Sequence, residues 1–445
     1  MTTLIENARI IVHGHPTRVN LVIESGRLES IGKKKISSFD EKIEANNNLV
    51  LPGLVDGHAH LHDPSFTNRE DFTTGTAAAG AGGVTTVVEM VLSTPVDTSE
   101  KAKTKIAVGE KKSLIDFSLH AGMMNLANSS NVGEIAKIGI RSFKTFTCKP
   151  YYVDDHALMS LMRETTTHGS ILNVHAEDEE TANANFRNLM ADGRKDPMAH
   201  LEWKPNIAEE LAIRKVVSFA HDLRARVHIS HMSTAQGVRI VKQAKRTHDN
   251  LTVETCPHYL TFTGNDMKKL GPYLKMNPSL RTSRDVQALW RGLQNGTIDL
   301  ITSEHAPGKR SEKEIGWNDI WKAWGGIPTI ETMLPVVLSE GVNKRRISVS
   351  RLQQVCCENP AKVFGIYPKK GVIRKGSDAD LVVVDLKAKR KVRADRLHYK
   401  VGWTPYEGWK LKGWPTMTIL RGQIIFEDGQ ILAKTGAAKF LPMFS

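Results

Sequence analysis

Hydrophobic and polar positions follow two different patterns along the chain. In the first part, short alternating apolar runs are separated by turn residues, and they fall at residues 8–12, 19–23 and 28–31. Glu24-Ser25-Gly26-Arg27 has the composition of a hairpin turn. From about residue 50, apolar β-branched runs alternate with segments of helical spacing, which is typical of a parallel sheet wrapped by helices. The pattern therefore predicts a small β module followed by an α/β domain.

Eight apolar runs are the candidate strands of the α/β domain, at residues 51–62, 84–90, 115–121, 140–143, 171–175, 226–231, 251–255 and 298–303. Helical spacing is found at residues 71–81, 154–167, 208–220, 234–247, 283–293, 329–338 and 350–363. Eight strands over roughly 250 residues match a (β/α)8, or TIM-like, barrel. Short strands return after residue 370, so we predict an α/β fold in which both termini build a small β-sandwich beside the barrel. The predicted domains are residues 1–50 and 365–445 for the sandwich and a tail, and 51–364 for the barrel.

Side chains that can bind metal follow several of these strands. The first candidate strand, read as one element over residues 51–62, carries His58 and His60, whose two-residue spacing points both side chains the same way. Two neutral imidazoles at one strand end can hold one divalent cation. Later strands end in Lys144, His175, His231 and Glu304. Because catalytic groups of such barrels lie at the carboxyl ends of the strands, we expect a metal site at one rim.

Lys144 needs an argument of its own, because an ammonium group cannot bind a cation. Burial beside other positive charges lowers the pKa of a lysine, and the free amine can then add carbon dioxide. The resulting carbamate offers two oxygens, one for each of two metal ions. Carboxylated Lys144 is therefore expected to bridge two divalent ions.

Composition narrows the remaining classes of function. The chain has 445 residues, 40% of them hydrophobic and 24% charged, and no apolar run approaches the roughly 20 residues of a membrane span. Its four cysteines form no C-x-x-C pair, which favours a reduced, cytoplasmic setting. The net charge of +13 could serve nucleic acid, but the basic runs are scattered and accompany no nucleic-acid-binding motif. We therefore expect no membrane and no nucleic-acid partner.

Several motifs resemble those of the cyclic amidohydrolases, in the order HAHLHDP, SFKTF, NVHAED, HISHMS, ETCPHYL, KMNPSLR, SEHAP and GIPTIETMLP. The resemblance is strongest to dihydroorotases of the long bacterial and archaeal type, with allantoinases and hydantoinases as close relatives. It implies hydrolysis of a cyclic amide C–N bond, first of all the interconversion of dihydroorotate and N-carbamoyl-aspartate. Allantoinase and hydantoinase or dihydropyrimidinase activity are the alternatives.

The resemblance also implies roles for single residues. It places His58 and His60 on one divalent ion, with zinc the expected metal, and His175 and His231 on a second, with carboxylated Lys144 between them. Glu304 matches the last metal-ligating carboxylate, which takes a proton from the attacking water and passes it to the leaving nitrogen. Asn277 matches a residue that hydrogen-bonds the substrate ring. His258 and Glu177 are expected to orient metal ligands.

Two departures from the family pattern bear on activity and substrate. The family's last-strand motif usually begins with aspartate, and Glu304 adds about 1.5 Å of reach, where a displacement near 1 Å can cost about 100-fold in rate. Dihydroorotases commonly carry an arginine, which grips the substrate carboxylate, at the position of His62. His62 itself, Arg69 or Arg281 could take that role, or the substrate lacks the carboxylate. Hydantoinases usually have a tyrosine at the position of Lys149, so neither template fits fully.

The sequence also leads to expectations about the oligomeric state, about a partner enzyme and about a non-catalytic alternative. The resemblance implies a homo-oligomer, a dimer or tetramer, with a partner enzyme of pyrimidine synthesis as a further option. A non-catalytic scaffold relative is the alternative to an enzyme; Glu304 favours it, whereas retention of the histidines and Lys144 opposes it. Trp317, Trp321 and Trp324 follow the last strand, and we expect them to pack a loop near the mouth of the site.

Overall fold

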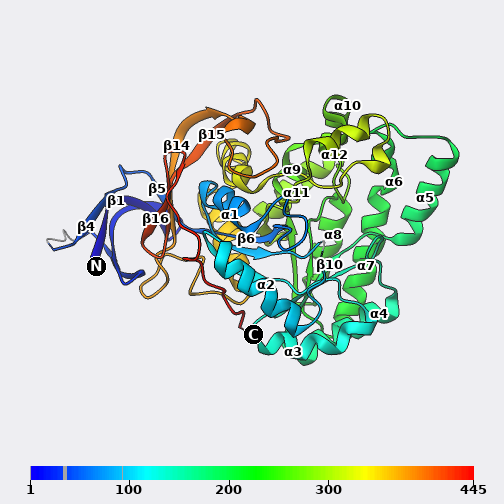
Figure 1. The fold of residues 1–445 in the computed structure, drawn as a ribbon, viewed down its shortest axis with the longest axis horizontal. Helices are drawn as coiled ribbons and strands as arrows, with labels where there is room; N and C mark the ends of the chain where they lie inside the picture. Colours follow the sequence, from blue (N-terminus) through cyan, green and yellow to red (C-terminus); the bar gives the residue numbers. More distant parts are fainter. Residues whose placement is uncertain (1, 34–37, 93, 445) are drawn as a thin grey trace.

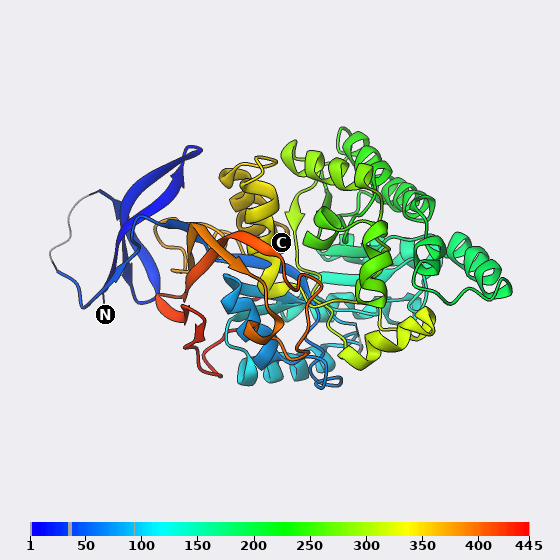
Figure 2. The ribbon, with the colours of Figure 1, turned by 90° about the horizontal axis from the view of Figure 1, so that it is seen from above.

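The computed structural model describes residues 2–33, 38–92 and 94–444. A large sheet built from both ends of the chain stands beside a helix-rich α/β part, with blue N-terminal and orange C-terminal strands side by side (Figure 1). Seen from above, β14 and β15 lie between the first strands of the chain and the helices (Figure 2). In the described part of the chain, no helix is long and apolar enough to span a membrane.

Within the described residues the large sheet has nine strands in the order β17-β16-β15-β14-β5-β1-β2-β3, with β4 paired to β1. Its N-terminal members are β1 Thr2–Val12, β2 His15–Glu24, β3 Arg27–Gly32, β4 Glu41–Glu44 and β5 Leu49–Pro52. Its C-terminal members are β14 Leu381–Lys391, β15 Lys410–Leu420, β16 Gln423–Glu427 and β17 Gln430–Ile431. The antiparallel pair β5–β14 joins the two ends of the chain. The predicted hairpin turn is confirmed, since Glu24 pairs with Arg27 across Ser25 and Gly26, both at positive φ.

Each of the eight predicted strand positions of the α/β part holds a parallel strand. Three form one sheet, β6 Leu54–Ala59, β7 Val84–Glu89 and β8 Asp116–Leu119. Five form another, β9 Ser142–Phe146, β10 Ile171–His175, β11 Val227–Ile229, β12 Leu251–Thr255 and β13 Leu300–Ile301. Single parallel bridges link the sheet edges at Ala121–Phe143 and Ala59–His305. The carboxyl ends of all these strands therefore face one region.

The prediction of a single strand over residues 51–62 is wrong. The first residues belong to β5 in the nine-stranded sheet, and β6 begins two residues later in the parallel sheet. Gly53 lies at the break, where a Cβ would stand 2.1 Å from Thr85 Oγ1, so only glycine fits this close approach. The apolar run is continuous because both strands are buried, and hydrophobicity alone cannot show that the chain changes sheets.

The predicted helices are found as α1 Phe72–Ala81, α4 Asp155–Thr167, α7 Asn206–Asp222, α8 Ala235–Ala244 and α11 Ser283–Gln294. The two C-terminal helical predictions correspond to α13 Met333–Val336 and to α14 Val349–Gln353 with α15 Asn359–Val363, joined by π-helical turns. Sequence patterning missed α2 Ser99–Lys112, α3 Val132–Lys137, α5 Glu179–Ala191 and α6 Ala199–Trp203. Shorter helices are α9 Pro257–Thr261, α10 Met267–Leu270 and α12 Arg310–Glu314. Helix α2 was missed because its buried face is only Ala102, Lys105 and Gly109, which leaves no apolar stripe.

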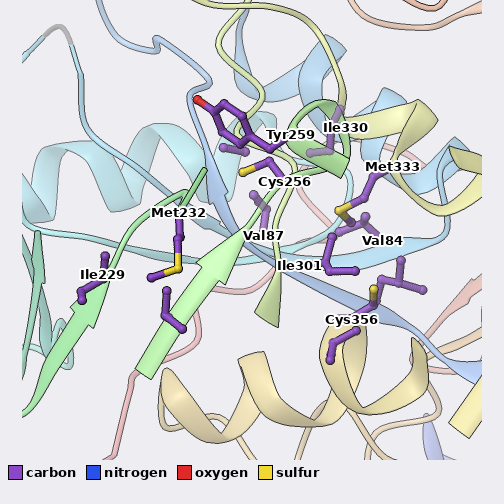
Figure 3. Close-up of a cluster of buried hydrophobic side chains, with 14 of the residues drawn as sticks. Val84, Val87, Ile229, Met232, Cys256, Tyr259, Ile301, Ile330, Met333 and Cys356 are labelled. Carbon is purple, nitrogen blue, oxygen red and sulfur yellow. The ribbon is translucent and has the colours of Figure 1, made fainter. Parts of the chain in front are cut away.

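The main hydrophobic core lies between the parallel strands and the helices around them. Figure 3 shows Val84, Ile301 and Met333 gathered between strands and a neighbouring helix, and all three are fully buried. Because interiors of this kind are close-packed, the strand ends that carry polar side chains are held in fixed relative positions.

Candidate metal centre

A cavity of roughly 800 Å³, including the space open to solvent, lies at the carboxyl ends of the parallel strands. It is lined by all six residues predicted from strand ends, His58, His60, Lys144, His175, His231 and Glu304. Asn277, Lys204 and Cys148 also reach it, and Leu92, Phe146, Tyr151, Ala306 and Trp324 supply apolar wall. Side chains more than 200 residues apart in the sequence therefore meet in one cavity.

The imidazoles of His58 and His60 are each held by a hydrogen bond from their Nδ1 nitrogen. His58 Nδ1 donates to the carboxylate of Glu254, and His60 Nδ1 donates to the carbonyl of Met90 at 2.7 Å. Burial lowers the pKa of both histidines, so both are neutral at pH 7. With Nδ1 protonated and engaged, each ring keeps its Nε2 lone pair for a cation.

The other two imidazoles face each other across the cavity wall. His175 Nδ1 lies 2.9 Å from His231 Nε2, and His175 Nε2 donates to Glu177 at 2.7 Å. Burial lowers the pKa of His175 to about 4 and that of His231 well below its usual value. Two nitrogens bound tetrahedrally to one zinc ion lie about 3.3 Å apart. The pair is therefore spaced almost as two ligands of a single cation are.

Lys144 is a buried lysine in β9 with a polar partner of its own. Its Nζ donates to Ser230 Oγ at 2.6 Å, and 1% of the residue is exposed. Burial lowers the pKa of Lys144 to about 8. At pH 7 about a tenth of this amine is therefore unprotonated, far more than for an ordinary lysine, and the unprotonated form is the one that can add carbon dioxide.

Glu304 follows the last parallel strand in a constrained backbone conformation. Its φ of 46° is left-handed, a conformation that costs a glutamate of the order of 1 kcal/mol or more. Ser303, just before it, donates its N–H to Asp56 at 2.9 Å, which fixes the end of β13 to β6. The Glu304 carboxylate lies 3.3 Å from His258 Nε2. Burial, and after it the charge of Glu254, raises the pKa of Glu304 well above its usual value.

The donor set fits divalent metal ions. Among the described residues, ligand atoms of His58, His60 and Glu304 lie within 4.8 Å of one another. The close nitrogen pair of His175 and His231 forms a second group, with Lys144 on the same cavity wall. Neutral imidazoles and carboxylate oxygen are the ligands that zinc and similar ions prefer. Two cation positions are therefore compatible with these side chains.

The residues suggested for substrate contact lie in different places. Asn277 lines the cavity, and its buried Oδ1 has no hydrogen-bond partner within the described chain. His62 is buried beside Trp324, with ring centres 5.8 Å apart. Arg69 pairs with Glu312, and Arg281 donates to Ser233 Oγ at 3.0 Å. His62, Arg69 and Arg281 are not among the residues that line the cavity.

Two further residues of the site escaped the sequence reasoning. Glu254 lies in β12 and holds His58, and a buried-strand run with one charged residue, LTVET, was a usable signal. Lys204 is fully buried and donates to Glu177 Oε2 at 2.7 Å and to Cys148 Sγ at 3.3 Å. Nothing in the local sequence marks Lys204 as buried, because it follows a short helix and precedes Pro205.

The tryptophans of the loop after β13 have separate roles. Trp324 lines the cavity, whereas Trp321 packs edge-on against Trp203 with ring centres 5.8 Å apart. Trp317 is 48% exposed and packs over Gly271. Trp324 thus lies at the site as predicted, whereas Trp321 and Trp317 are not among the residues that line the cavity.

Comparison with known proteins agrees with this arrangement. The amidohydrolase family model matches residues 49–425. The L-hydantoinase of Paenarthrobacter aurescens is 32% identical over 98% of this chain and 97% of its own length. A dihydroorotase of Methanosarcina acetivorans is 34% identical over 98% of this chain and 94% of its own length. An allantoinase of Rubrobacter xylanophilus is 33% identical over 97% of this chain and 95% of its own length.

Solved structures give the same result. The L-hydantoinase (dihydropyrimidinase) from Arthrobacter aurescens superposes with a TM-score of 0.95 at 32% identity, over 98% of this chain and 99% of that chain. A D-hydantoinase superposes with a TM-score of 0.95 at 29% identity, over 100% of this chain and 99% of that chain. The family predicted from the sequence motifs is thereby confirmed, and the chain belongs to the amidohydrolase family.

Proposed function

We propose that this protein hydrolyses a C–N bond of a cyclic amide with two divalent metal ions, zinc being the expected metal. His58 and His60 would hold one ion, His175 and His231 the other, with carboxylated Lys144 and Glu304 completing the set. The observation that carries the proposal is the convergence of these six side chains on one cavity, with four imidazoles kept neutral by burial. Relatives named hydantoinase, dihydroorotase and allantoinase support the reaction class.

The chain's own residues account for proton transfer and substrate orientation. When bound, the metal ions supply Lewis-acid polarisation and lower the pKa of water towards about 7. Bound cations would keep the Glu304 carboxylate ionised against the burial that raises its pKa, and Glu304 would then accept a proton from the attacking water and deliver it to the ring nitrogen as the C–N bond breaks. The Lys144 amine forms an Nζ–C bond with carbon dioxide and loses one proton to solvent. Asn277 Oδ1, buried without a partner in the described structure, would accept a ring N–H.

Within this class, the cavity walls favour a hydantoin with a neutral side chain. Phe146, Tyr151 and Trp324 give the cavity an aromatic wall. Neither Arg69 nor Arg281, the two arginines that could have bound a substrate carboxylate, lines the cavity. The L-hydantoinase relative supports the same choice.

Dihydroorotase activity, expected first from the sequence, is the second candidate. Lys204 favours it, because this buried cation lies in the cavity wall and could attract an anionic ring. Glu177 already neutralises Lys204, however, with a separation of 2.7 Å between Nζ and Oε2. We therefore prefer a hydantoin over dihydroorotate as the substrate.

The architecture we propose for this activity is a closed barrel over residues 51–364, beside a small β-sandwich that residues 1–50 and 365–445 build together. The two sheet-linking bridges support closure, and the β5–β14 pair supports the terminal module. A homo-oligomer remains a prediction from the resemblance.

The test compares kcat/KM of the metal-replete protein for both enantiomers of 5-benzylhydantoin, for allantoin and for dihydroorotate. We expect one hydantoin enantiomer to be the best substrate, and Glu304→Gln to lower its kcat by about 100- to 10,000-fold. A preference for dihydroorotate would select the second candidate. No turnover of any ring, with neither bound metal nor carboxylated lysine by native mass spectrometry, would favour the scaffold alternative.

A further inference from the structure

A second cavity lies behind one wall of the catalytic cavity. It has a volume of about 640 Å³, including space open to solvent, and Arg69, Glu312 and Lys322 are among the residues that line it. Trp324 and Gly325 line both cavities. Trp324 is therefore the partition between the candidate metal centre and the second cavity.

Arg69 lies on the far side of this partition. Its guanidinium carbon is 3.9 Å from the centre of the Trp324 ring, and Arg69 lines the second cavity but not the catalytic one. Glu312 accepts from Arg69 Nε at 3.1 Å and from Nη2 at 2.8 Å. The Nη1 group is not used by Glu312, and it keeps N–H donors for a second anion.

Several contacts fix the indole in place. The indole Nε1–H donates to the Ala306 carbonyl at 2.9 Å, and the Trp324 backbone carbonyl accepts from the buried Lys313 Nζ at 2.8 Å. A Cβ on Gly308 would stand 2.4 Å from the ring, and one on Gly326 would stand 2.9 Å from its nitrogen. Glycine backbone lies against two edges of the ring and the Arg69 guanidinium lies over its face, and together with the Nε1 hydrogen bond these contacts hold the indole in place. Trp324 is thus a rigid wall.

We propose that Trp324 determines substrate specificity by screening Arg69 from the catalytic cavity. With the indole in place, a ring substituent meets an aromatic face, which favours a neutral group. Without it, the guanidinium borders the cavity and can bind a substituent carboxylate through charge-assisted hydrogen bonds. This inference rests on the proposed function, because it concerns the substituent of the cyclic amide bound at the same site.

The test uses two pairs of rings that differ only in a carboxylate. Dihydroorotate and dihydrouracil are compared by kcat/KM, and orotate and uracil, which need not react, by calorimetric binding. We expect Trp324→Ala to raise the preference for the carboxylate member of each pair by about 10- to 100-fold. Trp324→Phe keeps an aromatic wall and should keep the wild-type preference. Trp324→Leu, a smaller change, is the alternative if the alanine variant does not fold.

The role of Arg69 is tested in the double variant Trp324→Ala/Arg69→Gln, which should lose the gained preference. An unchanged preference in Trp324→Ala or Trp324→Leu would overturn the screening role, and a gain that persists in the double variant would overturn the role of Arg69. Failure of the proposed function appears differently, as no hydrolysis of any cyclic amide by the wild type. The binding comparison still decides the inference in that case.

Discussion

Glu254 contacts residues on both sides of the candidate metal centre, and Glu254→Gln tests how the imidazoles are oriented. Its carboxylate accepts from His58 Nδ1 and, at 3.1 Å, from the backbone N–H of His231. His228 Nε2 lies 3.2 Å from its other oxygen. Burial by itself would raise the pKa of Glu254, but the His58 and His228 rings hold it well below the usual value. The site therefore contains a buried carboxylate that stays ionised.

The expected effect is on metal affinity more than on folding. A glutamine has the same shape and can still accept from His58 and His231 through its oxygen, so those hydrogen bonds survive. The lost negative charge makes the His58 ring a weaker ligand. Loss of such an outer partner typically costs about 10- to 100-fold in metal affinity, or about 1.4–2.7 kcal/mol. His228 can adapt, since its Nδ1 lies 2.8 Å from a Thr252 hydroxyl that can donate or accept.

The assay is competition for zinc with a chromogenic chelator, followed by kcat at saturating metal and by thermal unfolding of the metal-free protein. Glu331→Gln is the matched control. This buried glutamate also holds a histidine, with 3.0 Å between its Oε1 and His398 Nδ1, but neither residue lines the cavity. Metal affinity equal in wild type and Glu254→Gln would refute the reasoning, as would an equal loss in Glu331→Gln.

Three further outcomes follow from single residues. Lys144→Ala should remove bound metal and activity together, and two tightly held ions in that variant, measured by elemental analysis, would disprove the bridging role. Lys204→Met leaves the Glu177 carboxylate buried without its cation, so denaturant unfolding should show a loss of about 3–5 kcal/mol that Lys204→Met/Glu177→Gln partly restores. A hydrogen bond to Glu331 raises the pKa of His398 above its usual 6.5, so protonation of His398 favours the folded state. This stabilisation is present below pH 6.5 and is lost as pH rises through the folded-state pKa; His398→Gln should flatten the unfolding free energy over that window, and an unchanged pH profile would contradict this.

The sequence alone determined the strand positions of the α/β part and the candidate ligands at the strand ends. Apolar β-branched runs predicted every parallel strand, because burial on both faces leaves a continuous hydrophobic signal. The two-residue spacing of His58 and His60 and the strand-end positions of the later candidates were enough to bring them to one cavity. Local periodicity carries this information since it reports which face of each element is buried.

Only the tertiary structure decided which groups support or screen that site. Glu254 reaches His58 from 196 positions away, and Arg69 is held by Glu312 from 243 positions away. The change of sheet at Gly53 is likewise invisible locally, because it depends on the approach of Thr85. Such contacts arise from the packing of distant elements, and no periodicity within one element encodes the partner that another element will bring.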